Sequence, residues 1–193
     1  MRNLKNQVRS IGKLQTRADN NETDEMKIEG YFVVFNSETK LFENYYEEIS
    51  DKAFKDIDLT DIRALADHDT AKVLGRTKSQ TLSLTVDDKG LYGEITINKN
   101  DGEAVNLYER VKRGDIDQCS FGFNILDETM DTRADGSTKW TITEIELFEV
   151  SVVTFPAYAD TSVEARSAQI EQMKQRNLQT RKQQLKERIN KWH

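Results

Sequence analysis

Alternating apolar and polar residues dominate the chain between about residues 26 and 155 and predict a series of strands. The segment KIEGYFVVFN, residues 27–36, alternates and then becomes continuously apolar, as expected of a strand that enters a core. LSLTVDDKGLYGEITIN, residues 82–98, predicts a hairpin, with Gly90 available for a positive φ in the turn. WTITEIELFEVSVVTF, residues 140–155, predicts another long strand after a turn-rich segment. The body of the protein is therefore predicted to be β-rich.

Helical patterns are few. Asn100 and Glu103 have the spacing of a capping box, apolar residues follow at helical spacing, and Gly114 provides a stop. A shorter helix is expected over Asp51–Ile57, with Ser50 as its N-cap. Beyond about residue 162 the chain is rich in Gln, Lys and Arg and carries a thin apolar stripe, which predicts a helical tail. We therefore expect an α+β fold that is mainly β.

The charge is unevenly divided along the chain, which the net charge of −6 conceals. Residues 1–18 carry +5 and residues 165–193 carry +6, so the segment between them carries −17. We expect a basic N-terminal extension over 1–18, a folded domain over 19–164 and a basic helical tail over 165–193. An acidic domain repels nucleic acid, so we expect no specific nucleic-acid partner. Basic ends on an acidic body also suit self-association or loading into a larger assembly.

The composition argues against a membrane protein, a secreted disulfide-bonded protein and a metalloprotein. No apolar run approaches the roughly 20 residues that span a bilayer, and the N-terminus lacks the apolar segment of a secretory signal, so we expect no membrane partner. The single cysteine excludes an internal disulfide. Neither CxxC nor HExxH spacing occurs, and we expect no metal and no cofactor. A reducing, cytoplasm-like compartment follows as the default.

The segment QCSFGF, residues 118–123, places the only cysteine beside a serine. If this segment is a strand, Cys119 shares a face with two phenylalanines, where a thiol serves as a small apolar filler. Ser120 then faces the other way beside Gly122, whose missing side chain lets a backbone or a substrate approach. Alternation therefore favours Ser120 over Cys119 as a nucleophile, and cysteine chemistry remains the alternative.

A serine hydroxyl needs a base to accept its proton, and His68 is the only histidine apart from the terminal one. A lone histidine in a turn is more often structural. Alternation puts Glu149 on one face with Ile145 and Leu147, where an unpaired carboxylate is costly, so a contact with His68 would explain it. Asp69 competes for this role, and an exposed edge strand with Glu149 in water is the alternative.

Four segments together resemble the HK97-type prohead proteases of tailed phages. They are EGYFVVFN, LADHDTAKVLGR, QCSFGF and LFEVSVVTFPAY, and they occur in that family's order between about residues 27 and 165. The resemblance implies a fold like that of the herpesvirus assembly proteases, a β-barrel with flanking helices. It also implies a serine endopeptidase in which Ser120 is the nucleophile, His68 the base and Glu149 the third member of the triad.

The same resemblance implies a role in capsid maturation. Members of the family are packaged inside the procapsid in the cytoplasm of the bacterial host. They cut the scaffolding segment of the major capsid protein or a separate scaffold, and they cleave themselves. The alternative is a non-catalytic assembly or scaffolding protein with the same fold, which the charge partition would also suit. Arg76 is a candidate donor to the oxyanion, although an ordinary surface arginine fits the residue as well.

Overall fold

The alternating segments form strands in the computed structural model, which describes residues 5–18, 25–155 and Lys182. This part of the chain contains ten strands, one 3-10 turn (η1) and one α-helix. Their bounds are β1 (Gln7–Ala18), β2 (Met26–Val34), β3 (Thr39–Phe42), β4 (Tyr45–Ile49), η1 (Asp51–Phe54), β5 (Arg63–Ala66), β6 (Asp69–Arg76), β7 (Leu82–Val86), β8 (Gly90–Thr96), α1 (Gly102–Arg113), β9 (Gln118–Thr132) and β10 (Thr138–Val153). The predicted helical tail over 165–193 lies outside the described residues, apart from Lys182.

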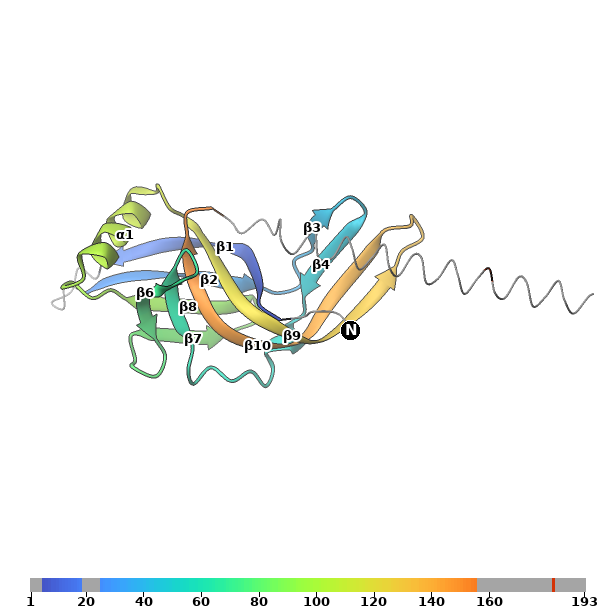
Figure 1. The fold of residues 1–193 in the computed structure, drawn as a ribbon, viewed down its shortest axis with the longest axis horizontal. Helices are drawn as coiled ribbons and strands as arrows, with labels where there is room; N and C mark the ends of the chain where they lie inside the picture. Colours follow the sequence, from blue (N-terminus) through green and yellow to red (C-terminus); the bar gives the residue numbers. More distant parts are fainter. Residues whose placement is uncertain (1–4, 19–24, 156–181, 183–193) are drawn as a thin grey trace, which may run out of the picture. The chain divides into compact units, whose positions relative to one another are not determined.

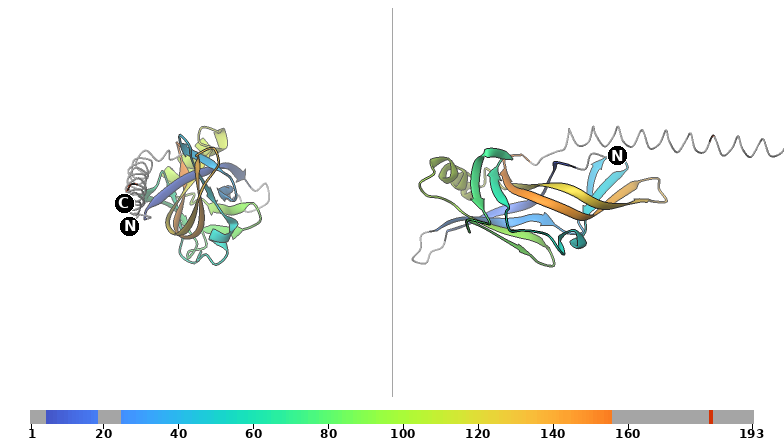
Figure 2. Two further views of the ribbon diagram at one scale, coloured as in Figure 1. Left: turned by 90° about the vertical axis from the view of Figure 1, so that its right-hand side faces the viewer. Right: turned by 60° about the horizontal axis from the view of Figure 1, so that its bottom comes forward.

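The long antiparallel pair of β9 and β10 organises the sheet. The strands follow the order β3-β4-β10-β9-β1-β2-β8-β7, and β3 and β7 at the two ends of this path do not pair with each other. On its other edge β10 pairs in parallel with β4 and then with β5, which continues into a hairpin with β6. Figure 1 shows β9 and β10 as a long curved pair, with β3 and β4 beside the half that contains the turn between them. Figure 2 shows the same pair from two further sides. The described residues therefore form an open, β-rich sheet.

The apolar core lies against one face of β9 and β10. Cys119, Phe121 and Phe123 of β9 are fully buried and belong to this core, together with side chains from β2, β8 and α1. The rings of Phe121 and Phe123 stack with their centroids 4.8 Å apart. Burial of each such ring contributes about 1.5–3 kcal/mol. The opposite face of the same strand is thereby left free for polar side chains.

Helix α1 begins one residue later than the capping-box spacing predicts. Asp101 is the N-cap, and its carboxylate accepts hydrogen bonds from the backbone N–H groups of Glu103 and Ala104. Gly114 ends the helix with a φ of 86°, as predicted. The shorter helix expected after Ser50 is the 3-10 turn η1 instead, and the Ser50 hydroxyl accepts from the N–H of Lys52.

The N-terminal segment that we expected to be an extension is largely a strand of the sheet. Residues 7–18 form β1, which pairs with β9 through its first half and with β2 through its second half. In QVRSIGKLQTRA, residues 7–18, every second residue from Gln7 is polar or charged except Ile11, and most of the residues between them are small or apolar. The segment therefore has the alternation of a strand in spite of its basic charge.

The β7–β8 hairpin forms where it was predicted, but Gly90 has a different role. Its φ is not positive, and a Cβ at this position would lie 1.9 Å from the carbonyl oxygen of Val33 on β2. Glycine is therefore required because two strands approach closely, and not because of the turn.

Candidate active site

His68 lies at the tip of the β5–β6 hairpin. Ala66 and Asp69 are paired in register, so Asp67 and His68 form a two-residue turn, and both have positive φ, 48° and 59°. A two-residue turn of type I′ needs positive φ at both of its central positions, which Asp and His tolerate better than most residues. The local backbone thus places the imidazole at a fixed point above the sheet.

Asp67 ties this turn to the end of β10. Its carboxylate accepts hydrogen bonds from the N–H of Thr154 at 2.7 Å and from the Thr154 hydroxyl at 3.1 Å. Its own N–H donates to the carbonyl of Val152 at 2.9 Å. These three bonds hold the turn beside the strand that carries Glu149.

Ser120 lies on β9 opposite Ser151 of β10, on the face that points away from the apolar core. Cys119 points into the core, where its thiol donates to the carbonyl of Tyr31 at 3.1 Å. The division of these neighbours between two faces is the one that alternation predicted. The structure therefore brings Ser120, and not Cys119, to the side of the sheet that carries His68.

Glu149 reaches the same face because β10 contains a bulge. The register with β9 shifts between Leu147, which opposes Phe123, and Glu149, which opposes Gly122. Since directly opposed residues point to the same side of a sheet, Leu147 faces the core and Glu149 faces away from it. The predicted grouping of Glu149 with Ile145 and Leu147 is wrong, because simple alternation omits the extra residue.

The three side chains form a continuous chain of contacts across the sheet. Nδ1 of His68 lies 2.7 Å from Oε1 of Glu149, and Nε2 of His68 lies 2.8 Å from Oγ of Ser120. The other carboxylate oxygen of Glu149 accepts a hydrogen bond from the Ser151 hydroxyl at 2.5 Å. The His68 side chain is 24% exposed and that of Glu149 is 13% exposed. A proton on Nδ1 that donates to Glu149 leaves Nε2 as an acceptor, which is the arrangement that general-base catalysis requires.

Gly122 makes room for the carboxylate of Glu149. A Cβ at this position would lie 2.4 Å from Oε1 and 3.1 Å from Cδ of Glu149. The space beside Ser120 that we expected to admit a backbone or a substrate is thus taken by the third polar side chain of the site.

Asp69 makes its contacts elsewhere. Its carboxylate accepts a hydrogen bond from the N–H of Ala71 at 2.9 Å and lies 3.7 Å from Nζ of Lys72. Of the two carboxylates that we considered as partners of His68, Glu149 is therefore the one that contacts the imidazole.

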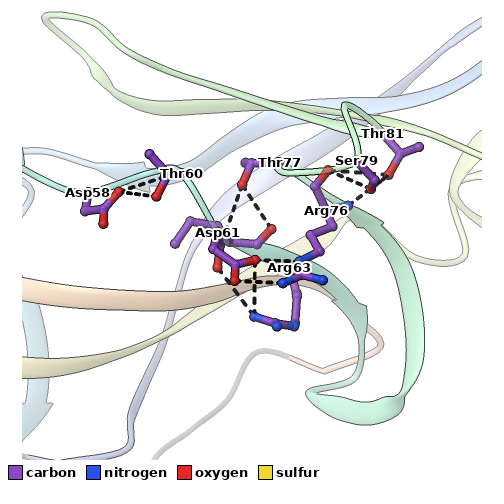
Figure 3. A network of polar contacts seen from close by, with 9 residues as sticks. Asp58, Thr60, Asp61, Arg63, Arg76, Thr77, Ser79 and Thr81 are labelled. Atoms are coloured by element: carbon purple, nitrogen blue, oxygen red, sulfur yellow. Dashed lines mark hydrogen bonds and ion pairs between the residues drawn. The ribbon is translucent and has the colours of Figure 1, made fainter.

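Arg76 is engaged in an ion pair at the opposite end of the hairpin. Its Nε and Nη2 donate to the two carboxylate oxygens of Asp61 at 2.5 and 2.7 Å, and Arg63 lies on the other side of the same carboxylate (Figure 3). The hydrogen bond from Arg76 holds the pKa of Asp61 below its usual value, and the same bond raises the pKa of Arg76. Arg76 thus braces the hairpin that carries His68.

Sequence reasoning missed two contacts of the site. One is the hydroxyl of Ser151 on Glu149, and the other is the backbone carbonyl of Arg9, which accepts a hydrogen bond from Oγ of Ser120 at 2.8 Å. The alternation of apolar and polar residues cannot predict the contact between the Ser120 hydroxyl and the backbone carbonyl of Arg9. A serine two residues after the acid on the same strand is the only hint of the first contact.

Two cavities lie near the site. One, of about 400 Å³, lies behind the turn and is lined by residues of β6 and α1 together with Asp67. The other, of about 760 Å³, is lined by residues 143–147 of β10, which precede Glu149. Neither cavity is lined by Ser120 or His68. In the described part of the chain, no group of three metal-ligating side chains is placed to hold an ion, and no helix is long and apolar enough to cross a membrane.

Comparison with known families places the site within a family match. A family model described as caudovirus prohead serine protease matches residues 12–176 of the 193-residue chain, a range that includes β2 to β10 and all three side chains of the site. Searches of the curated proteins and of the solved structures found no match.

Proposed function

Because the chain belongs to the caudovirus prohead serine protease family, we propose that it is a serine endopeptidase whose reaction is carried out by Ser120, His68 and Glu149. Membership indicates a protease of phage capsid maturation, which acts on the procapsid within the host. The observation that supports the assignment of these three residues is the unbroken contact from Glu149 through His68 to Ser120.

In the proposed reaction, Oγ of Ser120 attacks the carbonyl carbon of the scissile peptide bond while Nε2 of His68 accepts the hydroxyl proton. The tetrahedral intermediate collapses as His68 returns this proton to the nitrogen of the leaving amine, and the C–N bond breaks. Water then attacks the acyl-enzyme by the same route and releases the new carboxylate. Glu149 stays ionised throughout, accepts the Nδ1–H and stabilises the imidazolium.

The proposed substrates are the scaffolding segment of the major capsid protein or a separate scaffold protein, and also the protease itself. The resemblance of the four sequence blocks supports this part of the proposal. The same resemblance supports a fold related to the herpesvirus assembly proteases, with which the β-rich sheet is compatible. We place the reaction inside the procapsid, where protease and substrate are enclosed together.

Co-expression with the capsid protein of the same phage tests the proposal. Wild-type protein is expected to generate new capsid-protein termini, which mass spectrometry identifies, and Ser120→Ala is expected to abolish them. Cys119→Ala serves as the matched control, because it removes the neighbouring nucleophile from the core face of the same strand. Processing at the normal rate by folded Ser120→Ala would favour the non-catalytic assembly protein.

A further inference from the structure

Ser120 is fully buried although it is the proposed nucleophile. Its Oγ lies 2.8 Å from Nε2 of His68 and also 2.8 Å from the carbonyl oxygen of Arg9. A serine hydroxyl has a single proton to donate, so it cannot donate to both of these atoms at once. The position of this proton decides whether the serine is activated.

If the hydroxyl proton points to the carbonyl of Arg9, the Nε2 contact is a hydrogen bond only when Nε2 itself carries a proton. Nε2 then has no lone pair with which to accept the proton of the serine. If the hydroxyl proton points to Nε2 instead, two oxygen atoms face each other at 2.8 Å with no proton between them. The negative charge that grows on Oγ during attack would increase this repulsion. The carbonyl of Arg9 therefore opposes the activation of Ser120.

The side chain of Arg9 anchors this carbonyl. Its Nε and Nη2 both donate to the carboxylate of Glu47 on β4, the second at 3.2 Å, and the two side chains are only 6% and 3% exposed. Nη1 of Arg9 donates to the carbonyl of Val8 at 2.7 Å, and the guanidinium lies 5.9 Å from the ring centroid of Phe123. Loss of one member of a buried ion pair leaves the other charge uncompensated, which is strongly destabilising.

The residues around Arg9 form a separable part of β1. Gln7 to Arg9 pair with β9 alone, whereas the pairs between β1 and β2 start at Leu14. The register of β1 on β9 shifts between Arg9 and Gly12, so the ladder is interrupted between these two parts. Residues 7–9 can therefore leave β9 without breaking a pair between β1 and β2. They also precede residue 12, where the match to the family model begins.

We propose that Arg9 is a positioning residue that keeps the protease in a resting arrangement, with residues 7–9 acting as a self-inhibitory latch on the edge of β9. The latch closes when Arg9 binds Glu47 and its carbonyl holds the hydroxyl of Ser120. It opens when residues 7–9 leave β9, and an extended segment of the polypeptide substrate then takes their place beside Ser120. This inference rests on the proposed function.

Glu47→Gln tests the latch, because it keeps the shape of the side chain and removes the charge that binds Arg9. The measurement is the rate at which a fluorophosphonate labels the full-length protein, in which Oγ of Ser120 bonds to phosphorus and fluoride leaves. We expect labelling about tenfold faster than in the wild type, which corresponds to about 1.4 kcal/mol in favour of the open form. Structural damage alone would slow labelling instead.

Glu48→Gln is the matched control. Glu48 is the next residue of β4, and its carboxylate lies 2.7 Å from Nζ of Lys139 and is not part of the Arg9 ion pair. We expect it to be labelled at the wild-type rate. If Glu47→Gln does not melt cooperatively, deletion of residues 2–9 together with Glu47→Gln removes the latch without leaving a buried carboxylate unpaired, and the same increase is expected.

The outcomes separate the latch from the proposed function. If the wild type is labelled as fast as the folded variants, the latch is overturned while Ser120 remains the nucleophile. If neither the wild type nor any folded variant is labelled, the latch and the proposed function fail together. If the wild type is labelled and the folded variants are not, the latch alone is overturned. Faster labelling of the variants that disappears on adding Ser120→Ala supports both.

Discussion

Gly122→Ala is the sharpest test of the role of Glu149. The new Cβ would lie 2.4 Å from Oε1 of Glu149, whereas carbon and oxygen atoms in contact stay about 3.4 Å apart, so Oε1 has to move by about 1 Å. Cδ and Cγ of Glu149 would also be crowded, at 3.1 and 3.2 Å, so a rotation of the carboxylate alone does not relieve the contact. A shift of this size takes the 2.7 Å contact with Nδ1 of His68 out of hydrogen-bond range.

The expected effect on catalysis is large and the effect on stability small. A misplacement of 1 Å in a catalytic group costs about 100-fold in rate, so we expect kcat/KM to fall by about that factor, or about 2.7 kcal/mol of transition-state stabilisation. Complete loss of the orienting carboxylate sets an upper limit of about 10⁴-fold. The Glu149 side chain is partly exposed and can turn toward water, so the free energy of unfolding should change by about 1 kcal/mol or less.

The assay is steady-state hydrolysis of a peptide that spans a processed bond of the capsid protein, together with urea unfolding of the same samples. Gly102→Ala is the matched control, because a Cβ at that position meets no atom within 4 Å. It should leave kcat/KM unchanged. Unchanged kcat/KM in folded Gly122→Ala would refute the assignment of Glu149 as the residue that orients His68.

Three further predictions concern parts of the chain outside the proposed triad. Cys119→Ala should leave peptide hydrolysis unchanged and lower the free energy of unfolding by about 1 kcal/mol, measured in urea, because a fully buried thiol is removed from the core. Asp61→Asn should destabilise the protein near neutral pH. Arg76 lowers the pKa of Asp61 in the folded state, so the stability that this carboxylate contributes is present above its unfolded-state pKa. It is lost as the pH falls through the lower folded-state pKa, so the difference from wild type in urea titrations should shrink as the pH is lowered through that range. Truncation after residue 165 should preserve peptide hydrolysis but prevent incorporation into procapsids, measured by co-purification; loss of hydrolysis by a folded truncated protein would contradict this.

Strands that carry their pattern locally could be predicted from the sequence. The hairpin of β7 and β8 and the long strand β10 follow from alternation, since each buries one face. The pairing of β10 with both β4 and β5 could not be predicted, because the register between distant segments depends on contacts that no local pattern encodes. Strand β1 was missed for a different reason, since its basic residues suggested a solvated arm although one of them, Arg9, is buried in an ion pair.

The opposite facing of Cys119 and Ser120 was accessible to sequence reasoning, because it needs only the alternation of one short strand. The selection of Glu149 over Asp69 was not, because it depends on where the β5–β6 turn lies relative to β10. The carbonyl of Arg9 was out of reach altogether, since main-chain contacts leave no mark on residue type. Local alternation thus places a side chain on a face of its own strand, but it does not give the contacts between distant segments.

The bulge in β10 explains how one strand contributes apolar side chains to the core and also a carboxylate to the candidate site. Before it, Ile145 and Leu147 bury apolar side chains beneath the sheet; after it, Val150 and Val152 do so, and Glu149 is turned toward His68. Without the extra residue, the spacing from Leu147 would carry Glu149 into the core, where a carboxylate without a partner is costly. A register shift of one residue therefore moves a charge from a position where it would destabilise the fold to one where it can hold an imidazole. Glu149 therefore does not lie on the apolar face of β10.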